Sequence, residues 1–177
     1  MSFDSRLFNL SGFTMYNPID PKSLDADLKL PWLIVGIMLV MLITYLVLCF
    51  TLGTDLQQPL PEITRVKIRT ALYVVAIVSF PMTNLLRHIQ LKLNQTMPLT
   101  QADYRAEAKK RYLVTVIVSM TLMESIGAFG FVLFMLGDGN NNLFIFTGLA
   151  ALGLFLYRPK LEEYQRVVEL LAIKSHE

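Results

Sequence analysis

The chain has 177 residues and a formal net charge of +2 at pH 7, and 54% of its residues are hydrophobic. This charge is too small to indicate nucleic acid as a partner, and the hydrophobic fraction exceeds that of typical soluble domains. The apolar residues are concentrated in four blocks of roughly membrane-span length, which leaves no room for a second globular domain. A single cysteine excludes an intramolecular disulfide, and the sequence has no metal-ligand spacing of cysteine or histidine.

Residues 1–29 mix polar and apolar side chains and contain the turn signals Asn17-Pro18 and Asp20-Pro21. We expect a cytoplasmic or interfacial segment here, with a short interfacial helix around residues 3–10. The apolar run that follows is too long for the core of a cleavable signal peptide, so it is expected to remain as a membrane span.

The first two predicted spans cover about residues 30–52 and 68–90. Pro31 in the first turn is compatible with a helix start, and a proline at position 81 predicts a kink in the second span. Arg87 is expected to mark the end of the second span, where a basic connector of residues 87–112 begins. Within this connector, Thr100 is the predicted N-cap of the next helix.

The third and fourth predicted spans cover about residues 111–136 and 142–157. The glycine- and asparagine-rich loop between them, Gly137–Asn142, is short and predicts that these helices are antiparallel neighbours. Residues 158–177 have apolar positions at helical spacing and are predicted to form a cytoplasmic amphipathic tail. The predicted fold is an all-α integral membrane protein, with four transmembrane helices of residues 30–157 arranged as two antiparallel hairpins.

The distribution of basic residues predicts the orientation in the membrane. If both termini are cytoplasmic, thirteen of the 16 Lys and Arg residues lie on the cytoplasmic side, as the positive-inside rule requires. Four of them precede the third span and are candidates for contact with anionic lipid, namely Arg105, Lys109, Lys110 and Arg111.

Glu124 lies near the middle of the run Leu113–Leu136, which contains no other ionisable residue. A charged group at this depth costs roughly 2.5–3.5 kcal/mol, so it needs a structural or chemical role. Counting from the basic edge places four polar residues of other spans at a similar depth, and none of them is a cation: Thr44, Tyr45, Tyr73 and Thr147. Without a cation, desolvation favours the neutral carboxyl, which we expect to donate a hydrogen bond.

Small residues surround Glu124 along its helix. Gly127, Ala128 and Gly130 form a patch that permits close helix approach, and the simplest neighbour is the fourth span with Gly148 and Gly153. Two interpretations remain open. The carboxyl either fixes helix packing through a hydrogen bond, or binds and releases a proton or cation with help from Thr121, Tyr73, Thr44 and Thr147.

Two resemblances bear on these interpretations. A four-span chain with one mid-membrane glutamate in its third span resembles the proteolipid (c-type) subunits of rotary ATPases, although its first span has one glycine, Gly36, where proteolipids are glycine-rich. Aligning Leu52-Gly53-Thr54-Asp55 with Leu136-Gly137-Asp138-Gly139 gives a weak internal repeat that places Val40 opposite Glu124. Residues 111–160 are similar to a loose class of small four-span bacterial membrane proteins without assigned activity, through Met123-Glu124-Ser125-Ile126-Gly127-Ala128-Phe129-Gly130 and the closing Arg158-Pro159.

These observations predict a structural or accessory subunit of a larger membrane complex, without catalytic residues, cofactor or metal of its own. The second resemblance implies a multi-pass protein of the bacterial inner membrane. Its expected partners are the lipid bilayer and either other membrane subunits or further copies of itself. The alternative is a proton- or ion-translocating subunit that uses Glu124.

Overall fold

The computed structural model describes residues 21–97 and 103–174, and within these ranges the chain forms helices and no strand. The predicted interfacial helix around residues 3–10 and the predicted cap Thr100 lie outside the described residues. In chain order the elements are α1 (Pro21–Asp27), α2 (Lys29–Leu52), the 3-10 helix η1 (Gly53–Leu56), α3 (Glu62–Thr96), α4 (Tyr104–Met135), α5 (Asn140–Leu156) and α6 (Leu161–Lys174).

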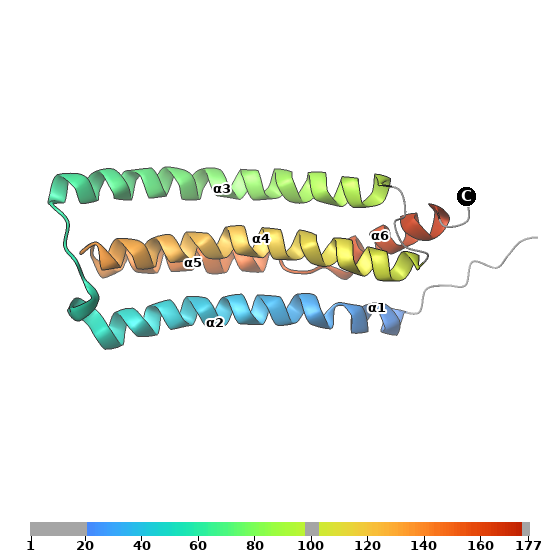
Figure 1. The fold of residues 1–177 in the computed structure, drawn as a ribbon, viewed down its shortest axis with the longest axis horizontal. Coiled ribbons are helices and arrows are strands. Elements are labelled where there is room, and N and C mark those ends of the chain that lie inside the picture. Colours follow the sequence, from blue (N-terminus) through green and yellow to red (C-terminus); the bar gives the residue numbers. More distant parts are fainter. Residues whose placement is uncertain (1–20, 98–102, 175–177) are drawn as a thin grey trace, which may run out of the picture.

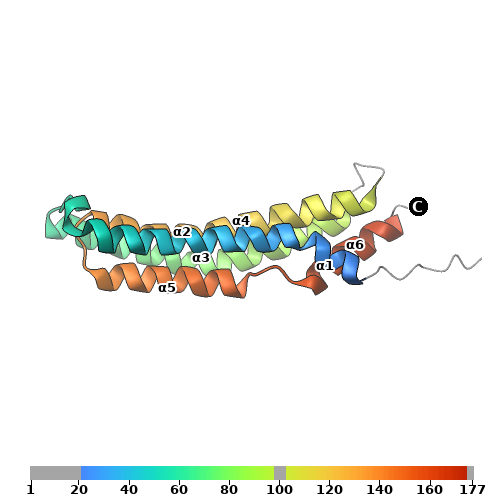
Figure 2. The same cartoon turned by 90° about the horizontal axis from the view of Figure 1, so that it is seen from below.

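Helix α4 forms the centre of the bundle. Figure 1 shows α2 and α3 on opposite sides of α4. Helix α5 packs antiparallel to the C-terminal part of α4, at the end of the bundle away from α1 and α6, as Figure 1 and Figure 2 show. Because α4 separates α2 from α3, the first two spans do not pair as the predicted hairpin. Helix α4 contacts α2, α3, α5 and α6 and is buried on several faces, as its core residues Val116, Met120, Met123, Ile126 and Leu133 illustrate.

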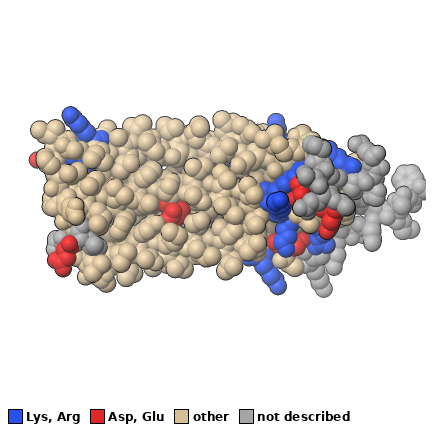
Figure 3. Space-filling model, in the orientation of Figure 1, with Lys and Arg blue, Asp and Glu red and all other residues tan. Residues whose placement is uncertain are grey.

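Three helical segments among the described residues are long and apolar enough to cross a membrane. They are Leu24–Leu52, which runs from α1 through α2, Glu62–Thr96, which is α3, and Tyr104–Met135, which is α4. Helix α5 has 17 residues, or about 25 Å, which is short for a hydrocarbon core of about 30 Å. Taken with α6, which is bent away from it by 44°, α5 provides a fourth candidate. On the face drawn in Figure 3, charged side chains lie at both ends of the molecule, and its middle is uncharged apart from one small acidic patch. These features are compatible with a multi-pass membrane protein.

The helices extend beyond the predicted spans into the basic connector. Helix α3 continues through Pro81 to Thr96, because Asn94 is held by α4: its backbone oxygen accepts a hydrogen bond from Arg111 at 3.1 Å. Helix α4 begins at Tyr104, where the N-cap Asp103 accepts a hydrogen bond from the backbone N–H of Arg105 at 2.9 Å. The connector is therefore largely helical on both sides of residues 98–102.

Helix α1 lies at the end of residues 1–29, the segment that was predicted to be cytoplasmic or interfacial. Its Leu24 side chain and Leu28 just after it are buried, and α1 contacts α6 at the end of the bundle. Asp27 receives hydrogen bonds from Arg105 and Lys109 of α4, both at 3.1 Å. Burial of the two leucines and neutralisation of Asp27 together explain why this segment is ordered against the bundle.

Candidate functional site

The candidate site is a carboxyl–phenol pair between α4 and α2. The Glu124 side chain is largely buried, and its Oε1 accepts a hydrogen bond from Tyr45 Oη at 2.6 Å. This distance is typical of a strong O–H···O bond. The pair therefore satisfies a polar group of α4 with a polar group of α2 at a depth where the sequence supplies no cation.

Neighbouring residues hold Tyr45 in place. Its ring stacks on Phe131 with ring centroids 5.3 Å apart, and Phe131 lies two turns after Glu124 on the same face of α4. One turn before Tyr45 on α2, the Leu42 side chain packs directly on Gly127 of α4. Because Gly127 has no side chain, α2 approaches α4 closely at this level, which brings the phenol within reach of the carboxyl.

The position of the carboxyl differs from the prediction. Glu124 was expected to face the fourth span, whereas it bonds to Tyr45 of α2. The small residue Gly127 explains the difference, because it contacts Leu42 of α2 as well as Ala150 of α5 and so admits both helices.

Of the four polar residues predicted at this depth, the structure brings only Tyr45 to Glu124. Thr44 is exposed and donates to Val40 O of its own helix, and Thr121 is exposed on α4. Thr147 Oγ1 is buried without a hydrogen-bond partner among the described residues. Tyr73 donates instead to Asn142 Oδ1 at 2.7 Å, near the loop between α4 and α5.

The register between α3 and α4 explains the position of Tyr73. The depth count assumed that Arg87 and Arg111 lie at the same membrane edge. In the structure Arg111 pairs with Asn94, seven residues further along α3. Glu124 therefore lies opposite the region of Pro81 and Met82, and Tyr73 lies about two turns beyond it.

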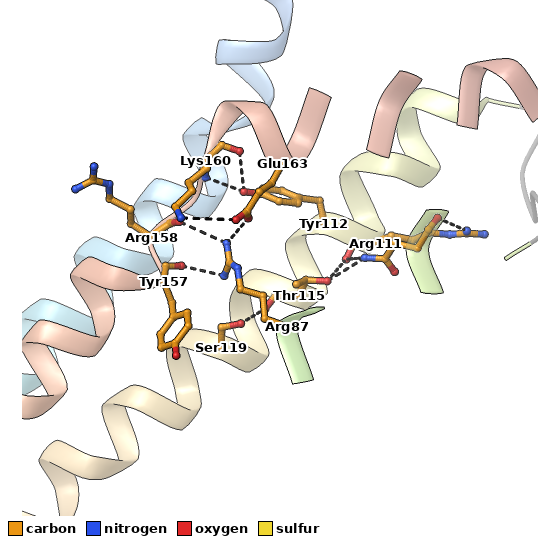
Figure 4. Close-up of polar contacts among 10 residues, drawn as sticks. Arg87, Arg111, Tyr112, Thr115, Ser119, Tyr157, Arg158, Lys160 and Glu163 are labelled. Carbon is orange, nitrogen blue, oxygen red and sulfur yellow. Dashed lines mark hydrogen bonds and ion pairs between the residues drawn. The ribbon is translucent and has the colours of Figure 1, made fainter. Parts of the chain in front are cut away.

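Arg87 forms a second polar centre, which Figure 4 shows at the junction of α5 and α6. Its guanidinium is buried and donates to Tyr157 O at 2.9 Å and to Glu163 Oε2 at 2.6 Å. A longer bond of 3.4 Å reaches Arg158 O. Carbonyls at a helix C-terminus lack intrahelical partners and attract cations, so Arg87 caps α5 from the neighbouring α3. Sequence reasoning placed Arg87 at the end of a span and missed this role.

Tyr112 of α4 holds the other side of the same junction, as Figure 4 also shows. Its hydroxyl accepts from the Lys160 N–H at 2.8 Å and donates to the Lys160 carbonyl at 3.0 Å. Its ring packs on Tyr164, whose hydroxyl donates to Asp27 at 3.0 Å. Burial raises the pKa of the Tyr164 phenol, and the hydrogen bond to Asp27 raises it further, so this tyrosine stays neutral at physiological pH.

A third polar cluster joins α3 to the loop between α4 and α5 at the opposite end. Arg69 makes two hydrogen bonds to the carboxylate of Asp138, at 2.7 and 2.8 Å. Asn142 also donates to Asp138, at 2.9 Å, and accepts from Tyr73. The paired geometry and the burial of Asp138 indicate that this cluster fixes α3 against the loop.

The glycines that were predicted to allow close helix packing differ in how much space surrounds their Cβ positions. A Cβ atom at Gly130 would lie 2.8 Å from Phe146 Cβ and 3.2 Å from the Leu143 carbonyl, and one at Gly153 would overlap Met123. Gly127 contacts α2 and α5 as described, and Ala128 beside it is half-buried. Gly148 has open space around its Cβ position, so it has no role in close packing among the described residues.

Most of the basic residues that were candidates for lipid contact are engaged within the protein. Arg105 and Lys109 pair with Asp27 of α1 at 3.0 and 3.1 Å. Arg111 pairs with Glu107 at 2.8 Å and donates to backbone carbonyls at the end of α3. Lys110 is exposed and has no side-chain partner among the described residues.

No group of three or more His, Cys, Asp or Glu residues in the described ranges is arranged to hold a metal ion. The chain matches no protein-family model, no curated protein and no solved structure.

Proposed function

We propose that the chain is a structural or accessory subunit of a larger membrane complex, with four spans and both termini on the cytoplasmic side of a bacterial inner membrane. The spans correspond to α2, α3, α4 and the short α5. The end that carries α1 and α6 also carries most of the Lys and Arg residues, which supports its cytoplasmic placement. The start of α3, which carries Arg65, Lys67 and Arg69, would then face outward.

One observation carries the accessory role. A lateral groove of about 350 Å³ runs along α3 beside Leu122 of α4, and its lining is mostly apolar. Val74, Val78 and Met82 line this groove and are half exposed or more. A transmembrane helix of another subunit would cover these apolar side chains.

A tryptophan at Val78, which lines the groove and is half exposed, tests this docking. We expect Val78→Trp to abolish recovery of a partner that co-purifies with the wild-type protein at fixed stoichiometry in mild detergent. Mass spectrometry of the purified complex identifies the partner and distinguishes another subunit from a second copy of this chain.

Val40→Trp is the matched control, because Val40 is an exposed valine of α2 and does not line the groove. This variant should retain the partner. If the Val78→Trp variant is folded by circular dichroism and still recovers the partner, the partner does not dock in this groove. A wild-type protein that purifies alone would contradict the accessory role itself.

Proton or ion translocation through Glu124 is the second candidate function. It is supported by the position of the carboxyl, which is largely buried in the middle of α4 and hydrogen-bonded to a hydroxyl that can exchange protons. In the accessory interpretation the same pair joins α2 to α4. The two functions therefore make opposite predictions for the titratable group.

Replacing Glu124 by glutamine separates them. The amide oxygen can still accept from Tyr45, so we expect Glu124→Gln to change the free energy of unfolding by less than about 1 kcal/mol. Partner recovery and proton flux in proteoliposomes should equal those of the wild type. Loss of proton flux from a stable, assembled Glu124→Gln complex would establish translocation in place of the accessory role. Tyr45→Phe is the companion variant, which removes the donor and keeps the ring stacked on Phe131.

A further inference from the structure

A second groove lies at the end of the bundle that carries α1 and α6. It has a volume of about 150 Å³ and is formed by α3 and α6. His88, Lys92 and Gln95 recur at i, i+4 and i+7 on α3, so they share one face of that helix. Leu91 of α3 also lines the groove, and Glu163 and Arg166 of α6 line its other side.

The groove has an excess of positive charge. The carboxylate of Glu163 is already engaged by Arg87 at 2.6 Å and lies 3.9 Å from Lys160 Nζ. Lys92 and Arg166 are exposed, and neither side chain has a hydrogen-bond or ion-pair partner in the part of the chain that the structure describes. Two unpaired cations therefore face a groove whose one carboxylate is neutralised by its neighbours.

Exposed apolar side chains continue from the groove along both helices. Leu85, Ile89 and Leu93 recur at i, i+4 and i+8 on α3, and Leu170 and Ile173 are exposed on α6. The cationic groups thus lie next to apolar surface, at the point where the uncharged length of α3 ends. This arrangement matches a molecule with an anionic head and apolar chains.

We propose that the groove of His88, Lys92, Gln95 and Arg166 binds the phosphate of an anionic phospholipid from the cytoplasmic leaflet. Lys92 supplies a point charge, and the planar guanidinium of Arg166 can donate two parallel hydrogen bonds to phosphate oxygens. The acyl chains follow the exposed apolar face of α3. This inference rests on the membrane placement proposed above and is independent of the accessory role.

Phosphatidylglycerol is the probe, added to the full-length protein in neutral detergent and followed by microscale thermophoresis. We expect it to bind more tightly than zwitterionic phosphatidylcholine. Each of Lys92→Gln and Arg166→Gln should weaken phosphatidylglycerol binding roughly fivefold, and the double variant should weaken it by more than about tenfold. Lys92→Arg keeps the charge and should retain binding.

Lys67→Gln is the matched control, because Lys67 is an exposed lysine of the same helix α3, near its opposite end, without a side-chain partner among the described residues. It should leave phosphatidylglycerol affinity unchanged. Equal losses in Lys67→Gln and Lys92→Gln would overturn the proposal in favour of diffuse charge attraction, and so would a double variant that binds like the wild type. Competition by inorganic phosphate as effective as that by phosphatidylglycerol would overturn the lipid as the ligand. The substituted side chains are exposed, and circular dichroism checks that each variant is folded.

Discussion

Replacing Arg87 by alanine is expected to lower the free energy of unfolding by about 3–5 kcal/mol, measured by denaturant unfolding in detergent micelles. The loss has two sources. The carboxylate of Glu163 and the carbonyl of Tyr157 both lose a hydrogen-bond donor at the junction of α5 and α6. Removing one member of a buried ion pair leaves the other uncompensated, which costs more than the pair contributes.

Two further variants show whether this effect comes from the capping geometry. Arg87→Lys keeps the charge but cannot reach a carbonyl and a carboxylate with separate nitrogens of one planar group, so it should recover part of the stability. Lys92→Ala removes an exposed cation one turn further along α3 and should change stability by less than about 0.5 kcal/mol. If Arg87→Ala were no more destabilising than Lys92→Ala, Arg87 would not cap α5.

The second large effect is expected at Gly130, where alanine should cost about 2–3 kcal/mol in the same assay. The added Cβ would meet Phe146 Cβ at 2.8 Å and backbone atoms of Leu143 at 3.2 and 3.3 Å. Backbone atoms of α5 cannot rotate away as the end of a side chain can, so α4 and α5 must separate.

Gly148→Ala provides the control for this prediction. Gly148 lies on α5 with nothing within 4 Å of its Cβ position. Because alanine favours a helix over glycine, this substitution should be neutral or stabilise the protein by up to about 1 kcal/mol. Similar losses of stability in Gly130→Ala and Gly148→Ala would show that helix contact at Gly130 is looser than the structure indicates.

The sequence predicts the helical class and the existence of the long apolar helices, because an apolar run of about 20 residues is a strong signal. It also places Tyr45 at the depth of Glu124. It does not predict the partners of a helix, because a lipid-facing leucine and a buried one have the same composition. The sequence therefore does not predict that α4 lies between α2 and α3.

Arg87 illustrates why the candidate site was predicted only in part. An arginine after an apolar run normally marks the membrane edge. Here Arg111 lies level with Asn94 of α3 and not with Arg87, and the guanidinium of Arg87 instead binds backbone carbonyls at the end of the short α5, inside the bundle. Because depth was counted from Arg87, the prediction placed Tyr73 level with Glu124. In the structure Tyr73 lies about two turns away from that level.

The central position of α4 also constrains how the protein is made. Helices α2 and α3 are synthesised first, yet α4 lies between them in the finished bundle. These two helices therefore gain their shared native neighbour only after α4 has been synthesised. The faces of α2 and α3 that α4 covers in the finished bundle lack that neighbour until then. A nascent chain that stalls before residue 104 lacks the helix that joins the other two.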